Sequence, residues 1–432
     1  MKENIFVVKA ICVLTGLIIL PACQPIQSEP LVSVPFVERV ELVAADTGGG
    51  FNNGENAWGG HQTRIVRNRY GLFTAYTVSG TGTFSHESDF DREWRLAKRT
   101  GDNQWTVIAK GQSGREPVNL LTSPDGELYI IGWPNKAAYV WKLDDEGVVL
   151  EEYHVPGQWY LSDWPYGSAG TNENGDTVVL QSVDKNSPQS DDFRWSYYSA
   201  AEKKWYSHYL ELSAEKRHCY TFLFPCGDGA VRWVSNRGVK WSEVGLCYPK
   251  GRFAYVFDSV GYWNIQDAKK KSAPEYLKIK QALQADCEWL YCSALGDAYV
   301  DTRGRMHILY KYQCDETQDQ RTYRHAVVAE GRVVKDVEHA REIGELQRII
   351  QDTKGRFYVI SSRAKAIYPA LCEDGTILGE PVPLDLGSYE AEYSGISLAV
   401  PRCGVRLADY VDCVFPSGGY KQWVYCRIRL RN

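Results

Sequence analysis

Side chains that can transfer protons or bind carboxylates recur at matched places along this chain. His, Tyr and Glu are typical acids and bases of enzyme sites, and Arg binds carboxylates through two parallel hydrogen bonds. Residues of these types lie about ten positions before a repeated glycine, where we expect the chain to reach one common site. The candidates for proton transfer are His61, His218, Tyr166, Tyr220, Glu116 and Glu345, and the candidates for ligand binding are Arg115, Arg217, Arg348, Tyr393 and Trp58.

His61 and His218 are the strongest of these candidates. We expect them on roughly opposite sides of a central axis, so that a ligand between them contacts both. Trp58 lies in "GGGFNNGENAWGGHQ", where glycines let the backbone approach a ligand and asparagine amides can bond hydroxyl groups. The alternative is that the candidate side chains satisfy loop backbone groups and line a hydrated channel along the axis.

A repeated phrase indicates which elements must position these side chains. A turn residue and a glycine precede a short apolar run, as in "PDGELYIIGW". A repeat of about fifty residues made of short strands is typical of β-propellers, in which each repeat is a four-stranded blade and a tight hairpin requires glycine. The repeated glycines are Gly71, Gly126, Gly175, Gly229, Gly304, Gly355 and Gly404. The sequence therefore predicts an all-β chain that forms a seven-bladed β-propeller over residues 36–432.

The last repeat supplies three strands and needs a fourth. The segment "FVERVELVAA", which starts at Phe36, belongs to no repeat and has the pattern of a strand. We predict that it forms the outer strand of the last blade, which would remove an open sheet edge. The longest gap between repeated glycines contains Ser272–Asp286, where Ser and Pro precede a modest apolar face and predict a short surface helix.

The N-terminal residues have the pattern of an export signal. A basic start is followed by an apolar run that is too short to span a bilayer. Leu20-Pro21-Ala22-Cys23 resembles the lipobox of bacterial lipoproteins. The resemblance implies a signal peptide over residues 1–22, lipidation of Cys23, a tether over residues 23–35 and a membrane-anchored protein of the cell envelope. Gln24 implies the outer membrane in a Gram-negative cell, and the alternative is an ordinary signal peptide.

Composition excludes some functions and does not determine how the cysteines pair. The chain of 432 residues has a formal net charge of −5 and no basic cluster that would indicate nucleic-acid binding. Aromatic residues make up 13%, which suits strands and surfaces that stack on sugar rings. All 12 cysteines except Cys12 and Cys23 lie beyond residue 218. We expect one or more disulfides among them, with the pairing open, and neither a metal site nor a cofactor.

Ser123-Pro124-Asp125-Gly126 resembles the Asp box of the sialidase-like, BNR-repeat propellers, with its glycine one position earlier. This superfamily includes polysaccharide lyases and glycoside hydrolases, so the resemblance implies a carbohydrate ligand. In a lyase, Arg115 or Arg217 would bind a uronate while His and Tyr side chains act as base and acid. In a hydrolase, Glu116 and Glu345 would be the catalytic pair. A propeller that binds a glycan or a protein at the cell surface without catalysis is the other possibility.

Overall fold

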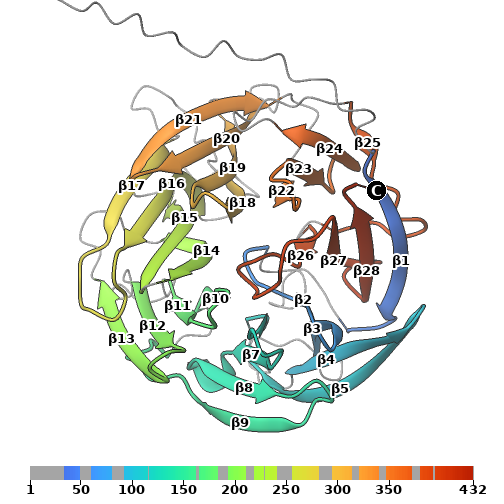
Figure 1. Cartoon of the computed structure of the whole chain (residues 1–432), viewed down its shortest axis with the longest axis horizontal. Helices are drawn as coiled ribbons and strands as arrows, with labels where there is room; N and C mark the ends of the chain where they lie inside the picture. Colours follow the sequence, from blue (N-terminus) through green and yellow to red (C-terminus); the bar gives the residue numbers. More distant parts are fainter. Residues whose placement is uncertain are drawn as a thin grey trace, which may run out of the picture. The chain divides into compact units, whose positions relative to one another are not determined.

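A computed structural model describes residues 34–48, 60–79, 92–114, 116–161, 165–182, 193–210, 218–227, 229–240, 255–281, 294–313, 321–339, 347–371, 380–392 and 395–431. These residues form seven four-stranded antiparallel sheets that follow one another around a central axis (Figure 1). The predicted seven-bladed β-propeller is confirmed.

Each blade runs from an innermost to an outermost strand. Blades one to four are β2 (Ile65–Asn68), β3 (Gly71–Ser79), β4 (Arg92–Gly101) and β5 (Gln104–Ser113); β6 (Asn119–Thr122), β7 (Leu128–Gly132), β8 (Tyr139–Leu143) and β9 (Val149–His154); β10 (Gly167–Thr171), β11 (Thr177–Gln181), β12 (Phe193–Ser199) and β13 (Lys204–Leu210); β14 (His218–Gly227), β15 (Ala230–Lys240), β16 (Tyr255–Ile265) and β17 (Glu275–Gln281). A short 3-10 helix, η2 (Pro134–Lys136), connects β7 to β8.

Blades five to seven follow the same order. They are β18 (Ala294–Val300), β19 (Met306–Gln313), β20 (Arg321–Ala329) and β21 (Arg332–His339); β22 (Gln347–Gln351), β23 (Phe357–Ser361), β24 (Ala366–Leu371) and β25 (Val382–Pro383); β26 (Ser397–Leu398), β27 (Tyr410–Ser417), β28 (Gln422–Arg429) and β1 (Phe36–Ala44). The inner strands β6, β10, β11, β22 and β23 are buried along their whole length, because neighbouring blades cover both faces of each sheet.

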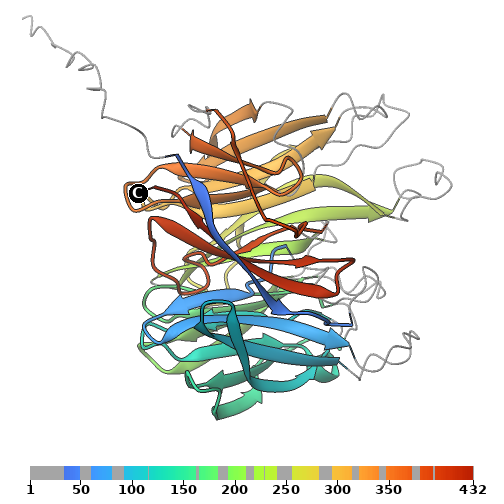
Figure 2. The same ribbon diagram turned by 90° about the vertical axis from the view of Figure 1, so that its right-hand side faces the viewer.

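The N-terminal strand β1 closes the ring as predicted. It pairs with β28 as the outermost strand of blade seven, and Figure 2 shows it, in blue, in front of the red strands of that blade. Glu41 of β1 also reaches blade one, where its carboxylate accepts hydrogen bonds from Arg99 Nη2 at 2.7 Å and Trp105 Nε1 at 2.9 Å. The strand therefore links the last blade to the first through its side chains as well as its backbone.

The repeated phrase encodes the turn between the first and second strands of a blade. The glycine takes a positive φ, +86° at Gly126, which residues with a Cβ rarely adopt. The side chain three residues before the glycine closes the turn: Asp301 Oδ1 accepts hydrogen bonds from the backbone N–H groups of Arg303 and Arg305, at 2.9 and 2.8 Å. Asp352 and Asn172 close their turns in the same way. The repeated residues therefore form the local hydrogen bonds that close these turns.

The helix predicted over residues 272–286 is wrong for the part that the structure describes. Residues 275–281 form β17, whose Leu277 pairs with Tyr262 of β16. Leu277 and Ile279 lie two residues apart, on one face of this strand, and pack with the apolar residues of blades four and five. Pairing with β16 therefore determines the local structure, and residues 282–286 lie outside the described residues.

The predicted signal peptide, Cys23 and most of the tether lie outside the described residues. Within the described ranges, no helix is long and apolar enough to cross a membrane. The cysteines that the structure describes are free thiols: Cys219, Cys226, Cys403, Cys413 and Cys426. A disulfide among the remaining cysteines stays a prediction.

Candidate functional site

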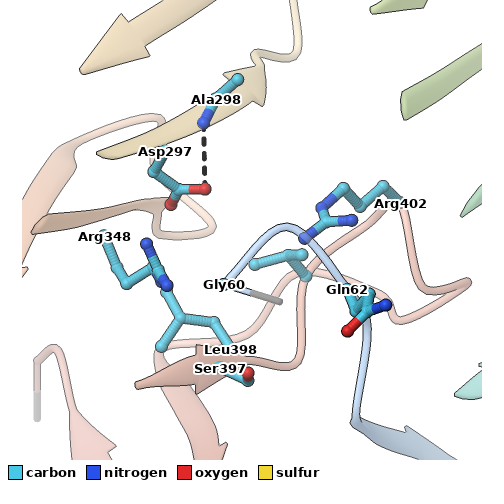
Figure 3. A pocket seen from close by; sticks show the side chains of 9 residues that line it. Gly60, Gln62, Asp297, Ala298, Arg348, Ser397, Leu398 and Arg402 are labelled. Carbon is cyan, nitrogen blue, oxygen red and sulfur yellow. Dashed lines mark hydrogen bonds between the residues drawn. The ribbon is translucent and has the colours of Figure 1, made fainter. Parts of the chain in front are cut away.

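A small hollow lies at the axis where the innermost strands of several blades begin. Its volume is about 10 Å³, enough for about one water molecule or the end of one polar group. Figure 3 shows the guanidinium groups of Arg348 and Arg402 extending into it from opposite sides. The lining residues come from the segment before β2, from β18, β22 and β26, and from the turn after β26: Gly60, Gln62, Asp297, Ala298, Arg348, Ser397, Leu398, Val400 and Arg402.

Buried arginines dominate the electrostatics of this hollow. Arg348 and Arg402 are buried, as is Arg64 beside them. Burial lowers the pKa of all three, and repulsion between neighbouring guanidinium groups adds to the effect at Arg64, whose pKa falls to about 9. In the described part of the chain, the carboxylates that interact with them are Glu116 and Asp297, and burial raises the pKa of Asp297. The hollow therefore carries an excess of positive charge.

The two arginines that line the hollow are held differently. Arg348 donates from Nε to the carbonyl of Ile396 at 2.6 Å and from Nη1 to the carbonyls of Gln347 and Gly296. Arg402 lies over the ring of Phe222, with 5.2 Å between its guanidinium carbon and the ring centroid. Its Nη1 is buried and has no hydrogen-bonding partner among the described residues. Arg402 is therefore available to bind an acceptor that enters the hollow.

Asp297 is fixed by backbone groups. Its Oδ1 accepts from the N–H of Ala298 (Figure 3) and its Oδ2 from the N–H of Ile349, both at 2.9 Å. These bonds join β18 to β22 and hold the carboxylate near Arg348, because a buried carboxylate needs hydrogen-bond donors for its lone pairs. Asp297 thus offsets part of the arginine charge without filling the hollow.

An aromatic cluster lies beside the arginines. The ring of Tyr220 is 5.6 Å from that of His61 and 5.2 Å from that of Tyr166, with edge-to-face geometry in both pairs. Tyr166 and Tyr220 both have positive φ, 45° and 54°, although neither is glycine. Residues with a Cβ rarely adopt this conformation, and such strained residues cluster at functional sites. Two strained tyrosines in contact therefore point to a role for this cluster.

Charge and burial set the protonation of the aromatic cluster. Burial, followed by the positive charges of Arg402 and Arg64, lowers the pKa of His61 to about 3. Burial also raises the pKa of Tyr220 well above its ordinary value. His61 is therefore a neutral imidazole and Tyr220 a neutral phenol at neutral pH. An anion bound to the arginines would cancel their charge and raise the pKa of His61, which would make it a better base.

The structure brings five of the predicted site residues to this region: His61, Tyr166, Tyr220, Glu116 and Arg348. It does not bring His218 there. The ring of His218 packs 5.2 Å from Trp263 and bonds Ser235 Oγ through Nδ1 at 2.9 Å, inside the apolar part of blade four. His218 therefore does not face His61 across the axis.

Five further predicted site residues lie outside the described residues: Trp58, Arg115, Arg217, Glu345 and Tyr393. Sequence reasoning missed Gln62, Arg64, Asp297 and Arg402. Gln62 and Arg64 follow His61 closely, and Arg402 lies two residues before the repeated glycine of blade seven. For Arg64 and Arg402, the signal in the sequence was an arginine close to His61 and to Gly404.

No protein-family model matches this chain, and no curated protein matches it. Solved structures do. The polysaccharide lyase Uly1 aligns with a TM-score of 0.50 at 12% identity, covering 91% of this chain and 100% of that one. A catalytically inactive virginiamycin B lyase from Staphylococcus aureus, crystallised with quinupristin, aligns with a TM-score of 0.48 at 12% identity, covering 90% and 98%. The GH93 alpha-L-arabinofuranosidase of Fusarium graminearum aligns with a TM-score of 0.41 at 10% identity, covering 72% and 92%. At these identities the likeness concerns the fold alone.

Proposed function

We propose that this propeller binds an acidic glycan and holds a carboxylate of the sugar at the axis, between Arg348 and Arg402. One observation carries the proposal: Arg402 Nη1 is buried, lies at the hollow and has no partner among the described residues. A buried guanidinium without an acceptor is costly, and a carboxylate would supply two acceptors in the matching plane. The hollow has room for about one carboxylate oxygen, so the sugar ring would remain outside it.

The aromatic cluster and the fold support a sugar as the carrier of the anion. Tyr220 packs on His61, on which Arg402 and Arg64 act, and Tyr166 packs on Tyr220. Phenol groups can stack on sugars and bond their hydroxyl groups. The similarity to the polysaccharide lyase Uly1 extends along the whole of that chain but concerns the fold. The arginine charge therefore remains the main argument for an acidic ligand.

A lyase is the catalytic function that the geometry supports best. Arginines on the uronate carboxylate would lower the cost of removing the proton from the adjacent carbon. His61 would accept that proton, the C–H electrons would form the new C=C bond, and the leaving oxygen would depart with a proton from Tyr166 or Tyr220. A hydrolase would need Glu116 as acid or base, yet its two oxygens already accept from the Tyr166 N–H and from Gln62 Nε2. This occupation of Glu116 disfavours hydrolysis.

Binding without catalysis is the second candidate function. It is favoured by the depressed pKa of His61 and the raised pKa of Tyr220, because neither group is poised to exchange protons near neutral pH in the unliganded protein. Both candidates share the carboxylate site, so one experiment can separate them.

The test uses the purified domain with trigalacturonate, alginate oligomers and heparin oligomers. Calorimetry measures binding, ultraviolet absorbance detects unsaturated sugars, and a reducing-end assay detects hydrolysis. Arg402→Gln should weaken binding at least about tenfold, because it removes a charged donor from a buried contact. Arg363→Gln, at an exposed site, is the matched control and should bind as the wild type does. Failure of all acidic sugars to bind, or unchanged binding by Arg402→Gln, would contradict the proposal.

We also propose that the protein is anchored in the cell envelope by a lipid on Cys23. The support is the order Leu20-Pro21-Ala22-Cys23 after an apolar run. Cys23→Ser should move the protein from the membrane fraction to the soluble fraction and abolish palmitate labelling of the whole protein. Retention in the membrane fraction without label would contradict the anchor.

A further inference from the structure

Glu116 joins the first three blades at the axis. It lies just before β6, is 2% exposed, and its Oε1 accepts a hydrogen bond from the backbone N–H of Tyr166 at 3.1 Å. Its Oε2 accepts from Gln62 Nε2 at 3.2 Å. The other end of the Gln62 amide, Oε1, accepts from Arg64 Nη2 at 3.4 Å. One line of hydrogen bonds therefore runs from Tyr166 in blade three, through blade two, to Arg64 in blade one.

The chemistry of this line permits one orientation of Gln62. An ionised carboxylate only accepts hydrogen bonds, and a guanidinium only donates them. The Gln62 amide lies between the two, so it must turn its NH₂ group to Glu116 and its oxygen to Arg64. Gln62 lines the hollow (Figure 3), and its orientation decides whether a donor or an acceptor faces Arg64. Glu116 does not line the hollow, but it determines which end of the Gln62 amide faces Arg64.

The other end of the line holds a strained residue. Tyr166 has a φ of 45°, and its ring packs against that of Tyr220. Glu116 accepts from its backbone N–H, while its carbonyl accepts from Ser182 Oγ at 3.1 Å. Without the carboxylate, the N–H would lose this acceptor and the backbone could relax toward the ordinary region of φ. The ring of Tyr166 would then leave its place beside Tyr220.

We propose that Glu116 is a positioning residue of the axial site, which sets the place of Tyr166 and the orientation of Gln62 and Arg64, rather than a group that exchanges protons with a ligand. The inference rests on the proposed function, because ligand binding reports on the site. It differs from the sequence expectation for Glu116, which made it an acid or a base.

A reciprocal exchange of the two side chains tests the line. In Glu116→Gln, the new amide can accept from the Tyr166 N–H only by turning its own NH₂ toward that of Gln62, so one contact is lost. In Gln62→Glu, two carboxylates face each other at the 3.2 Å contact and repel. In the double variant, the amide introduced at position 116 donates to the carboxylate introduced at position 62, and that carboxylate accepts from Arg64. Every donor of this line of hydrogen bonds again meets an acceptor, and the net charge equals that of the wild type.

The readouts are the affinity for trigalacturonate and the urea-unfolding midpoint of all four proteins. Each single variant should bind about tenfold more weakly, and the double variant should return to within about threefold of the wild type. If the wild type binds but the double variant is no better than the singles, the inference is overturned. It is also overturned if the singles lose stability while binding is unchanged, because that pattern shows a purely structural role.

A failure of the proposed function gives a different result. If the wild type does not bind trigalacturonate, the uronate proposal fails. The unfolding midpoints alone then test whether the line of hydrogen bonds orients Gln62. Recovery of the midpoint in the double variant then supports the orientation of Gln62 by Glu116. Additive losses in the singles and the double variant overturn it.

Discussion

Lowering the pH from 7 to 5 should destabilise this propeller steeply, because several of its histidines are buried. Burial lowers the pKa of His61 and His218 to about 3 and that of His339 to about 4. Burial, followed by the neighbouring histidines and Lys335, lowers the pKa of His325 well below its ordinary value. Each of these imidazoles is neutral in the folded protein and would have to charge without leaving its buried position.

Blade five shows why such charging is unfavourable. Asp301 Oδ2 bonds His307 Nε2 at 3.1 Å, and His307 Nδ1 bonds His325 Nε2 at 2.9 Å. His339 stacks on His325, with 5.7 Å between ring centroids. Asp301 already pairs with Arg305, while the positive charges of Arg324 and Lys335 act on His339 and His325. A proton added to His325 or His339 therefore meets repulsion.

The sign and size of the effect follow from linkage. The folded pKa values are depressed relative to about 6.5 in the unfolded chain, so the unfolded state binds more protons. The contribution to stability is fully present above about pH 6.5 and is lost as the pH falls toward the folded values. His61, His218 and His339 each lose about 2 kcal/mol by pH 5, about 6 kcal/mol together, which is comparable to the whole stability of an ordinary domain, and His325 adds to the loss. The slope between pH 6 and 5 from the first three is roughly 4 kcal/mol per pH unit.

Urea unfolding followed by tryptophan fluorescence at pH 7, 6 and 5 measures this slope. His339→Phe keeps an aromatic ring beside His325 and should reduce the slope by about a quarter, because one titrating group of four is removed. His154→Gln is the control, since His154 is exposed on β9. A wild-type free energy of unfolding that is flat between pH 7 and 5, or an unchanged slope in His339→Phe, would refute the reasoning.

Two further predictions concern closure and turns. Glu41→Gln should lower the free energy of unfolding by about 3 kcal/mol in urea titrations, because Arg99 and Trp105 lose a buried carboxylate. The control is Glu151→Gln, at an exposed site on β9, which should have no such effect. Gly404→Ala should cost more than about 2 kcal/mol, because its Cβ would lie 1.9 Å from the carbonyl oxygen of Thr122 at a φ of +86°. Gly419→Ala, with φ of +70° and open space around the Cβ, measures the backbone strain alone; equal losses in the two glycine variants would refute the steric argument.

The fold could be predicted from sequence because its repeating signal is local. The turn at Gly304 depends on residues that lie within five positions of one another: Asp301 closes it and Gly304 supplies the positive φ. Such a signal survives without knowledge of the rest of the chain. The strand β17 had no such signal, since Ser272 and Pro274 indicated a helix start while pairing with β16 determined the outcome.

The site could be predicted only in part, because distance along a strand does not give the side to which a residue points. Counting back from the glycine selected both His61 and His218, yet successive strand residues face opposite ways and His218 faces the interior of its blade. A bulge between Cys219 and Phe222 changes the register further. In blade seven, β26 has two residues, so the count passed over Arg402 in the following turn. The hollow is assembled from segments that are far apart in sequence.

The pairing of β1 with β28 sets the order of events when the chain is made. The first strand of the propeller to leave the ribosome has no neighbour in its own sheet until the last strand follows, nearly four hundred residues later. Six blades can assemble during synthesis. The seventh blade, which contributes Arg402 to the hollow at the axis, can assemble only after β28 has been made. A nascent protein stalled in its final blade would therefore hold folded sheets around an axis that still lacks Arg402.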